Sequence, residues 1–199
     1  MKKKDKVAIF GGTFDPIHYG HLMIAEQIRS NFYLDEIIFM PSTTPPYKKQ
    51  VTNSNLRLKM LKAAIKNNDL FSISTWELDK KNFSYSYKLI DEYIPTIDAK
   101  EVFFVIGSDL LFNIINWYKG EYFLSNSKFI VVNRPGYNIE LILNDDNFNS
   151  YINNIEVFND FYFDISSTYI RNQIKAGLST KYLIPESVKK IINKYNIYK

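Results

Sequence analysis

The sequence contains no cysteine among its 199 residues. This absence excludes a disulfide scaffold, thiolate catalysis and a zinc site built from cysteines. It is in keeping with a reducing cytoplasm, where we expect the protein to work. Histidine is nearly lacking as well, because the only two in the chain are His18 and His21.

Long hydrophobic runs are lacking too. Residues 102–106 are typical of the longest, whereas a membrane span needs roughly 20 apolar residues. The basic segment at residues 2–6 leads directly into a strand-like run and has no apolar centre of a signal peptide. We therefore expect neither a membrane partner nor a targeting segment.

Charge of one sign is in only slight excess. Lys and Arg number 25 against 21 Asp and Glu, which leaves a net charge of +4, and only four of the 25 are arginine. The lysines are scattered, whereas a nucleic-acid-binding protein usually concentrates its basic residues on one face. We expect no nucleic-acid partner and interpret the excess as solubility with some attraction for anionic ligands.

The composition is that of an ordinary globular protein. Hydrophobic residues make up 46% and charged residues 23%, which excludes global disorder. The length predicts a single domain over residues 1–199. The chain has no internal repeat, and the Asn- and Asp-rich residues 144–149 predict a surface loop.

Short apolar runs rich in β-branched and aromatic residues recur along the chain. Continuous runs, rather than alternating ones, predict strands that are covered on both faces. They fall at residues 7–10, 36–40, 71–74, 101–106, 129–133 and 155–158.

Helix-like stretches lie between these runs. Four of them fall at residues 19–32, 56–65, 85–93 and 110–118. Two more close the sequence, one after the N-cap pair Ser167 and Thr168 and one with Pro185 as its first helical residue. The alternation predicts an α/β fold with a doubly wound, mostly parallel sheet and helices on both faces. Ligands in such sheets bind beyond the carboxyl ends of the strands.

The segment after the first predicted strand has the chemistry of a phosphate site. Residues 10–21 read FGGTFDPIHYGH and lead into the first predicted helix. Gly11 and Gly12 let backbone N–H groups approach a ligand closely, and a helix N-terminus adds unpaired donors and a partial positive charge. His18 and His21 are three residues apart, so both can face the same side of the first turn.

Other interpretations of this segment are weaker. It contains neither a G-x-G-x-x-G nor a Walker A pattern, so the common phosphate loops do not apply. Zinc needs a third ligand, and although Asp15 is near, the spacing is no known signature. We assign no metal ligand to the chain. The simpler alternative is a helix-capping turn that carries two surface histidines.

Residues 11–21 resemble the signature of the nucleotidyltransferases that carry an HxGH motif. The resemblance implies a Rossmann-like α/β fold related to class I aminoacyl-tRNA synthetases. It also implies transfer of a nucleotidyl group to a phosphate with loss of pyrophosphate. Mg²⁺ would assist, bound mainly through the ATP phosphates.

Further segments, in order over nearly the whole chain, resemble the bacterial nicotinate-nucleotide adenylyltransferases. Residues 41–48 are similar to that family's PxxxPPHK segment and 56–61 to the arginine-bearing helix after it. Residues 104–109 are similar to FxxGxD, Trp117 to the family's tryptophan, 133–137 to RPGY, 165–171 to ISSTxIR and 182–188 to YLVPxxV. The sequence departs from the pattern at Tyr47, where the family has His, at Ser86, where it has Thr, and at Lys88, where Asp is common.

The resemblance implies an ATP site that the C-terminal helices, from about residue 167, complete. His18, His21 and Arg171 would be catalytic and would stabilise charge on the phosphates. Arg171 follows Ser167 and Thr168 by one turn, which suits a second anion site for the β- and γ-phosphates. The full set of ATP-binding residues implied is Gly11, Gly12, Thr13, Phe14, His18, His21, Gly107, Asp109, Ile165, Ser166, Ser167, Thr168 and Arg171.

The resemblance also implies residues for the second substrate, nicotinate mononucleotide. They are Lys48, Ser86, Trp117, Tyr118 and Arg134. Several have simpler alternatives. Lys48 could be a solvated loop lysine, Trp117 a core residue rather than a stacking partner of the nicotinate ring, and Arg134 a structural residue of the turn after its strand. Asp109, which ends an apolar strand, could contact ribose or metal, or could cap the helix that follows.

The sequence therefore predicts an enzyme that adenylylates nicotinate mononucleotide in NAD synthesis, with ATP and that mononucleotide as partners and a homo-oligomer left open. The nearest alternative is another HxGH transferase, such as a phosphopantetheine adenylyltransferase. A nucleotide-sensing module without catalysis and an RNA-binding fragment related to the synthetases are alternatives of other classes. The latter would need a KMSKS-like loop, which residues 165–171 are not.

Overall fold

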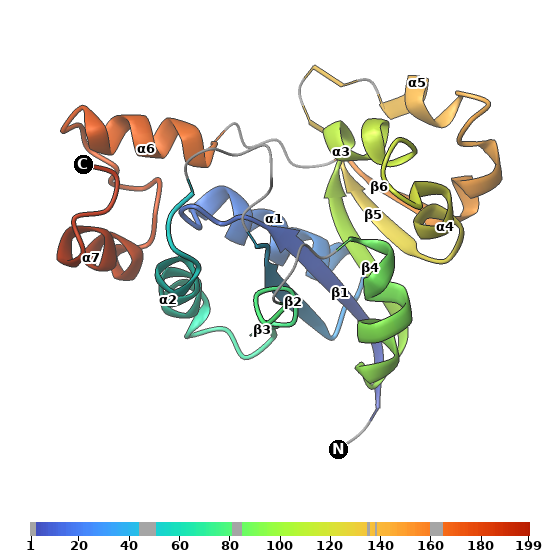
Figure 1. Ribbon diagram of the computed structural model, residues 1–199, viewed down its shortest axis with the longest axis horizontal. Coiled ribbons are helices and arrows are strands. Elements are labelled where there is room, and N and C mark those ends of the chain that lie inside the picture. Colours follow the sequence, from blue (N-terminus) through green and yellow to red (C-terminus); the bar gives the residue numbers. More distant parts are fainter. Residues whose placement is uncertain (1–2, 44–50, 81–84, 135, 138, 160–164) are drawn as a thin grey trace.

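A computed structural model shows a six-stranded sheet in the centre of the molecule (Figure 1). It describes residues 3–43, 51–80, 85–134, 136–137, 139–159 and 165–199. The strand order is β3-β2-β1-β4-β5-β6, and every neighbouring pair is parallel. The strands are β1 (Lys4–Gly12), β2 (Glu36–Pro41), β3 (Phe71–Ile73), β4 (Ala99–Gly107), β5 (Lys128–Val132) and β6 (Ile155–Phe158).

All six strands predicted from the apolar runs are present, with ends that differ by at most three residues. The sheet is wholly parallel, where the sequence predicted a mostly parallel one. The strand order turns in opposite directions from β1 and from β4, which lie side by side. This is the topological switch point, at which doubly wound sheets hold their ligands.

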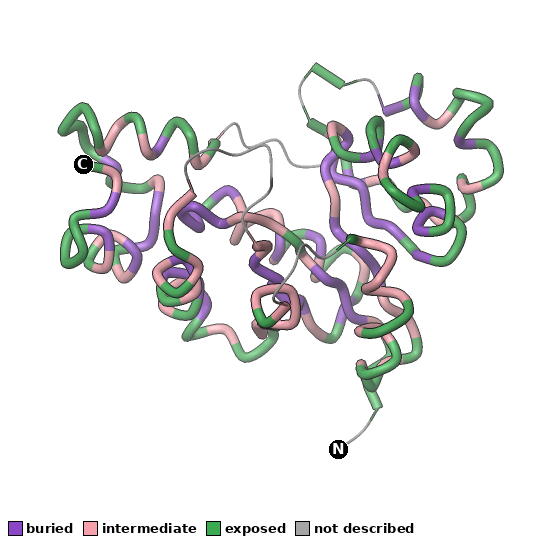
Figure 2. Tube along the Cα trace, in the orientation of Figure 1, coloured by how far each residue is buried: buried purple, intermediate pink, exposed green. Residues whose placement is uncertain are grey.

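Helices cover both faces of the sheet, and each face has its own apolar core. Alternate residues of one strand point to opposite faces, so Ala8 joins one core cluster and Ile9 the other. Figure 2 shows the buried residues concentrated along the central strands. The first face is covered by α1 (Tyr19–Asn31), α2 (Ser54–Ile65), α6 (Ser167–Lys175) and α7 (Glu186–Lys194). The second is covered by α3 (Ser108–Ile114), α4 (Gly120–Ser125) and α5 (Ile139–Leu143).

Several predicted helix boundaries were wrong. The stretch at 110–118 is helical only as α3, which ends at Ile114, so Trp117 and Tyr118 lie in the turn before α4. Lys119 adopts a left-handed φ of 56° there, which a continuing helix would not allow. Pro185 is the N-cap of α7 rather than its first residue, because its backbone is extended with ψ of 144°.

The predicted stretch at 85–93 is helical from Tyr87: after Tyr87 and Lys88 it forms the π-helical segment η1 (Leu89–Tyr93), which the 3-10 turn η2 (Ile94–Thr96) follows. The sequence did not predict α4, α5 or the 3-10 segment η3 (Asn149–Asn154). Residues 144–149 form surface turns as predicted, except that Phe148 is buried in the second core. No helix in the described part of the chain is both long enough and apolar enough to cross a membrane.

Candidate active site at the switch point

The loop between β1 and α1 lies at the carboxyl end of the central strand. The Phe14 side chain is buried among the rings of Phe10, Phe39 and His21, with its backbone at a left-handed φ of 48°. The Gly12 carbonyl accepts from the Ser42 N–H at 2.8 Å, and the Thr13 carbonyl accepts from Arg57 at 2.6 Å. The buried ring and these two bonds hold the loop in place.

The two histidines stack on each other at the start of α1. Their ring centroids are 3.6 Å apart with planes inclined by 29°. His18 is the N-cap, and its Nδ1 accepts a hydrogen bond from the His21 backbone N–H at 3.4 Å. Gly20 makes this packing possible, because a Cβ there would lie only 3.0 Å from His18 Nδ1.

Both imidazoles are neutral in the isolated protein. Burial lowers the pKa of His18 to about 4, and the positive charge of Arg134 lowers it as well. Burial, His18 and Arg134 lower the pKa of His21 well below its usual value. Since His18 Nδ1 is an acceptor, its neutral ring carries the proton on Nε2 as a donor. His21 Nδ1 is buried and has no hydrogen-bond partner among the described residues.

The first turn of α6 packs against this loop from a position some 150 residues further along the chain. Ser167 Oγ donates to the Pro16 carbonyl at 3.0 Å. Arg171 donates to the Asp15 carbonyl at 2.8 Å and to Thr168 Oγ1 at 3.1 Å. Ile165, just before the helix, packs against the first core near Gly20. The structure therefore brings Arg171 and the two histidines to the same loop.

The predicted N-cap pair Ser167 and Thr168 was wrong. The N-cap is Ser166, whose Oγ accepts from the Tyr169 N–H at 3.1 Å. Its extended backbone, with φ of −117° and ψ of 148°, places the side chain over the open helix end. The hydroxyls of Ser167 and Thr168 are engaged with Pro16 and Arg171 instead.

The carboxyl ends of β4 and β5 supply a carboxylate and a guanidinium. Arg134 Nη1 lies 3.3 Å from Asp109 Oδ2, while Asp109 Oδ1 is buried and unpartnered among the described residues. Asp109 lies in the first turn of α3 and does not cap it, because the N-cap is Gly107. A Cβ on Gly107 would approach Asp109 Oδ1 to 2.2 Å and Arg134 Nε to 2.8 Å.

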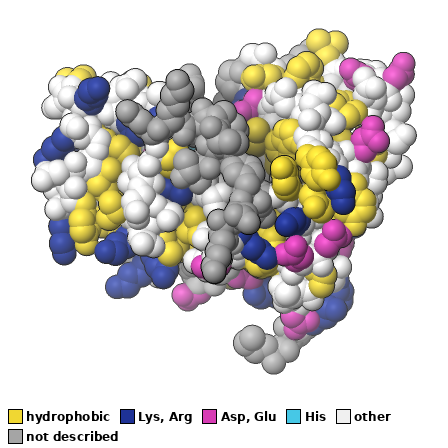
Figure 3. All heavy atoms as spheres, viewed as in Figure 1, with side chains coloured by type: hydrophobic (Ala, Val, Ile, Leu, Met, Phe, Trp, Pro, Cys, Tyr) yellow, Lys and Arg dark blue, Asp and Glu magenta, His cyan; other side chains and the backbone are white. Residues whose placement is uncertain are grey.

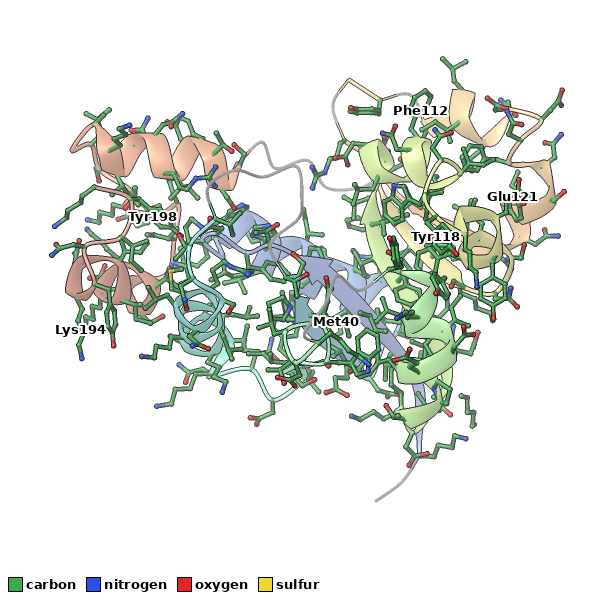
Figure 4. All side chains as sticks on the ribbon, in the orientation of Figure 1. Met40, Phe112, Tyr118, Glu121, Lys194 and Tyr198 are labelled. Atoms are coloured by element: carbon green, nitrogen blue, oxygen red, sulfur yellow. The ribbon has the colours of Figure 1, made fainter. Side chains whose placement is uncertain are left out.

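Three tyrosines gather beside the turn that follows α3. The rings of Tyr85 and Tyr87 lie 5.0 and 5.8 Å from that of Tyr118, so Ser86 between them is close to Tyr118. We call these three residues the tyrosine cluster; Figure 4 labels Tyr118, and Figure 3 shows hydrophobic side chains gathered on this half of the surface. Lys119 Nζ lies 4.2 Å from the Tyr87 ring centroid.

Trp117 is half-buried and packs against the second core, with its ring stacked on Phe123 at 6.4 Å and 20°. At least one face of the Trp117 ring is therefore packed as in a core tryptophan. Lys48, the remaining predicted substrate residue, lies outside the described residues, as does Tyr47.

Comparisons with known proteins identify the family of this chain. The family model described as cytidylyltransferase-like matches residues 9–173. A probable nicotinate-nucleotide adenylyltransferase of Clostridium kluyveri is 41% identical over 98% of this chain and 99% of its own length. A protein of the same description from Clostridium tetani is 42% identical over the full length of both chains. The chain belongs to the nicotinate-nucleotide adenylyltransferase family.

Solved structures support the fold assignment. A Plasmodium falciparum nicotinic acid mononucleotide adenylyltransferase complexed with NaAD has a TM-score of 0.77 and covers 98% of this chain and 97% of its own, at 23% identity. The same Plasmodium enzyme complexed with APC has a TM-score of 0.74 over the same shares of the two chains. The Rossmann-like α/β fold predicted from the sequence is therefore confirmed.

The sequence analysis missed how this member of the nicotinate-nucleotide adenylyltransferase family holds its loop. Arg57 of α2 is fully buried and donates to the carbonyls of Thr13, Ser42 and Thr52 at 2.6, 2.8 and 2.9 Å. One guanidinium thereby binds the backbone of three segments: the loop after β1, the residue after β2 and the segment before α2. The signal was available, because Arg57 is one of only four arginines and sits among apolar residues of a predicted helix.

Two carboxylates near Arg57 were also missed. Asp15 is 4% exposed, and its Oδ2 accepts from the Thr52 N–H at 3.1 Å. Glu77 accepts from the Thr43 N–H at 3.4 Å, and burial raises its pKa to about 7. No sequence pattern marks Glu77, since its place depends on where the chain after β3 returns to the end of β2.

Proposed function

We propose that this protein transfers the adenylyl group of ATP to nicotinate mononucleotide, giving nicotinate adenine dinucleotide and pyrophosphate, the penultimate step of NAD synthesis. The observation that carries the proposal is the meeting of His18, His21 and Arg171 at one loop of the switch point. Full-length relatives at about 40% identity with that described activity support the choice of substrates.

The reaction needs positioning and charge stabilisation rather than a general base. An oxygen of the mononucleotide phosphate, already anionic, forms a bond to the α-phosphorus of ATP. The bond from that phosphorus to the oxygen bridging to the β-phosphate breaks, and pyrophosphate leaves with the electron pair. Catalysis then rests on donors aimed at the phosphates.

His18 and His21 supply such donors. The Nε2–H of His18 can donate to an α-phosphoryl oxygen, and the unpartnered Nδ1 of His21 lies in the same buried cluster. A triphosphate beside these rings favours their protonated forms, since an anion raises the pKa of a neighbouring imidazole. The positive charge would then develop where negative charge must be stabilised.

The remaining ATP contacts come from the loop and from α6. Gly11, Gly12, Thr13 and Phe14 would bind through their backbone, and Arg171 with Ser167 and Thr168 would take the β- and γ-phosphates. Arg171 is partly exposed and already held on one side by the Asp15 carbonyl. A guanidinium fixed in this way loses little freedom when it binds phosphate.

Mg²⁺ fits this site through the nucleotide. The described residues contain no group of three His, Cys, Asp or Glu side chains that could hold a metal ion. Asp109 Oδ1, buried and unpartnered, is a hard oxygen ligand of the type that Mg²⁺ accepts beside phosphates. When bound, the ion would neutralise phosphate charge. Asp109 would hold it or the ribose hydroxyls, with Gly107 leaving the space.

The mononucleotide would lie on the α3 and α4 side. Arg134 is 56% exposed at its side chain and can take the mononucleotide phosphate. Trp117, Tyr118 and Ser86 would surround the nicotinate ring and its carboxylate, and Lys48 stays a prediction. The homo-oligomer, the single-domain extent and the cytoplasmic location also stay predictions.

The test is formation of the dinucleotide and pyrophosphate by the purified protein with ATP and Mg²⁺. Nicotinate mononucleotide and nicotinamide mononucleotide are run side by side. We expect a strong preference for the nicotinate form, because a site built for a carboxylate leaves donors unpaired with an amide. Release of no pyrophosphate with either mononucleotide would refute the proposal, and phosphopantetheine would be tried next.

A further inference from the structure

A tyrosine near the end of the sequence touches the candidate active-site loop. The Tyr198 hydroxyl donates to Asp15 Oδ1 at 2.5 Å, across 183 positions of sequence. Its ring packs against the first core, next to the buried Ile197. Figure 4 places Tyr198 between the ribbons of α6 and α7.

Asp15 connects this tyrosine to the rest of the loop. One carboxylate oxygen accepts a hydrogen bond from the Tyr198 hydroxyl and the other accepts one from the Thr52 N–H. The Asp15 carbonyl accepts from Arg171 Nη1 at 2.8 Å. Tyr198, Asp15 and Arg171 thus form a continuous series of contacts that ends at a guanidinium we assign to the triphosphate.

Several contacts act on Tyr198 at once. Its φ of 67° is left-handed, a conformation that is uncommon for a residue with a large side chain. Its neighbours include Asp15 and Arg171, and burial together with the bond to Asp15 raises the pKa of the phenol. The phenol therefore stays protonated and donates its hydrogen bond to Asp15.

We propose that Tyr198 is a positioning residue for the adenylyl transfer, acting on ATP through Asp15 and Arg171. A buried carboxylate needs donors on both oxygens, and the backbone N–H of Thr52 serves only one of them. With Tyr198 bound, the Asp15 side chain is held at both of its oxygens, which restricts the residue whose backbone carbonyl accepts from Arg171. This inference rests on the proposed function, because it takes Arg171 to bind the triphosphate.

The experiment compares Tyr198→Phe with Tyr195→Phe in the full chain. The first variant keeps the half-buried ring and removes only the hydroxyl that binds Asp15. The second removes a hydroxyl from the same tail, where Tyr195 is exposed and receives a hydrogen bond from Lys59 at 3.2 Å. Steady-state kcat and KM are measured for ATP and for nicotinate mononucleotide separately, with thermal unfolding curves for each protein.

We expect Tyr198→Phe to lower kcat/KM for ATP by roughly five- to tenfold, the scale of the net contribution of one hydrogen bond. The KM for the mononucleotide should stay within twofold, because its predicted residues lie on the α3 and α4 side. Tyr195→Phe should match the wild type in every constant. An equal rise in KM for both substrates, or an unchanged kcat/KM for ATP, would overturn the inference.

Asp15→Asn provides a second route if Tyr198→Phe is unfolded at the assay temperature. It should show the same loss selective for ATP, and an Asp15→Asn protein with wild-type ATP kinetics would overturn the inference. If Tyr198→Phe folds, the variant that carries both substitutions should lose no more kcat/KM for ATP than Asp15→Asn alone, because both substitutions break the same series of contacts. Additive losses of kcat/KM would contradict the inference. A wild type that makes no dinucleotide would refute the proposed function itself, which is a distinct result.

Discussion

The imidazoles of His18 and His21 lie face to face, 3.6 Å apart, at the first turn of α1. Burial lowers the pKa of both rings, so they are neutral near pH 7 in the isolated protein. In the proposed function, a bound triphosphate raises these pKa values and favours the charged rings. This pairing is the centre of the proposed chemistry.

His18→Asn separates catalysis from helix capping. Asparagine is a good N-cap, so the bond that His18 accepts from the His21 N–H can be replaced. We expect kcat to fall by about 10²- to 10³-fold, the usual effect of removing one donor to a developing charge, while thermal unfolding changes little. Pyrophosphate release and a melting curve measure the two effects. Tyr19→Phe, which changes the next residue at the surface, is the control.

Arg57→Lys tests the fastening of the loop. A lysine ammonium cannot reach the three carbonyls that the guanidinium holds, and it leaves buried acceptors unpaired. We expect the free energy of unfolding to fall by about 3 kcal/mol, measured by urea denaturation. Arg29→Lys, on α1 with a surface ion pair to Glu26, should cost less than about 1 kcal/mol. Similar costs for the two variants would contradict the role given to Arg57.

Gly107→Ala tests the crowding at the end of β4. The new methyl would meet Asp109 Oδ1 and Arg134 Nε, so this pair must move apart. We expect a loss of about 1–3 kcal/mol of stability from overpacking and a higher KM for the substrates. Gly11→Ala places a methyl where nothing lies within 4 Å, so its stability should stay within about 0.5 kcal/mol of wild type. Urea denaturation of both variants decides, and equal stability would refute the steric account.

Glu77→Gln tests the effect of a buried carboxyl on stability. Burial raises the pKa of Glu77 from 4.5 to about 7, so the folded state binds its proton more tightly than the unfolded state. The stability that this provides is complete below pH 4.5 and is lost as pH rises through 7. Glutamine cannot ionise, so the variant does not lose this stability. Its free energy of unfolding relative to wild type should therefore rise by about 2 kcal/mol from pH 5 to pH 8. Urea denaturation of both proteins at the two pH values measures this change. The same difference in free energy of unfolding at both pH values would contradict the raised pKa of Glu77.

The strands, the order of the motifs and the position of the loop with Gly11, Gly12, His18 and His21 could be predicted from the sequence. These are local properties: a run such as 36–40 is apolar throughout because both faces of its strand are covered, and the glycines and histidines of residues 11–21 lie within one strand-to-helix turn. Short helices such as α4 were not predicted, because six residues are too few to show the apolar periodicity of a helix.

The side chains that hold the site together became evident from the packing of the folded chain. Arg57 joins three segments, Ser166 rather than Ser167 caps α6, and Tyr198 reaches Asp15 from 183 residues away. Each outcome depends on where distant backbone groups come to rest when the two cores are packed. A sequence shows which residues can bond, whereas packing selects the partner, because a buried polar group must be satisfied by whatever the fold brings beside it.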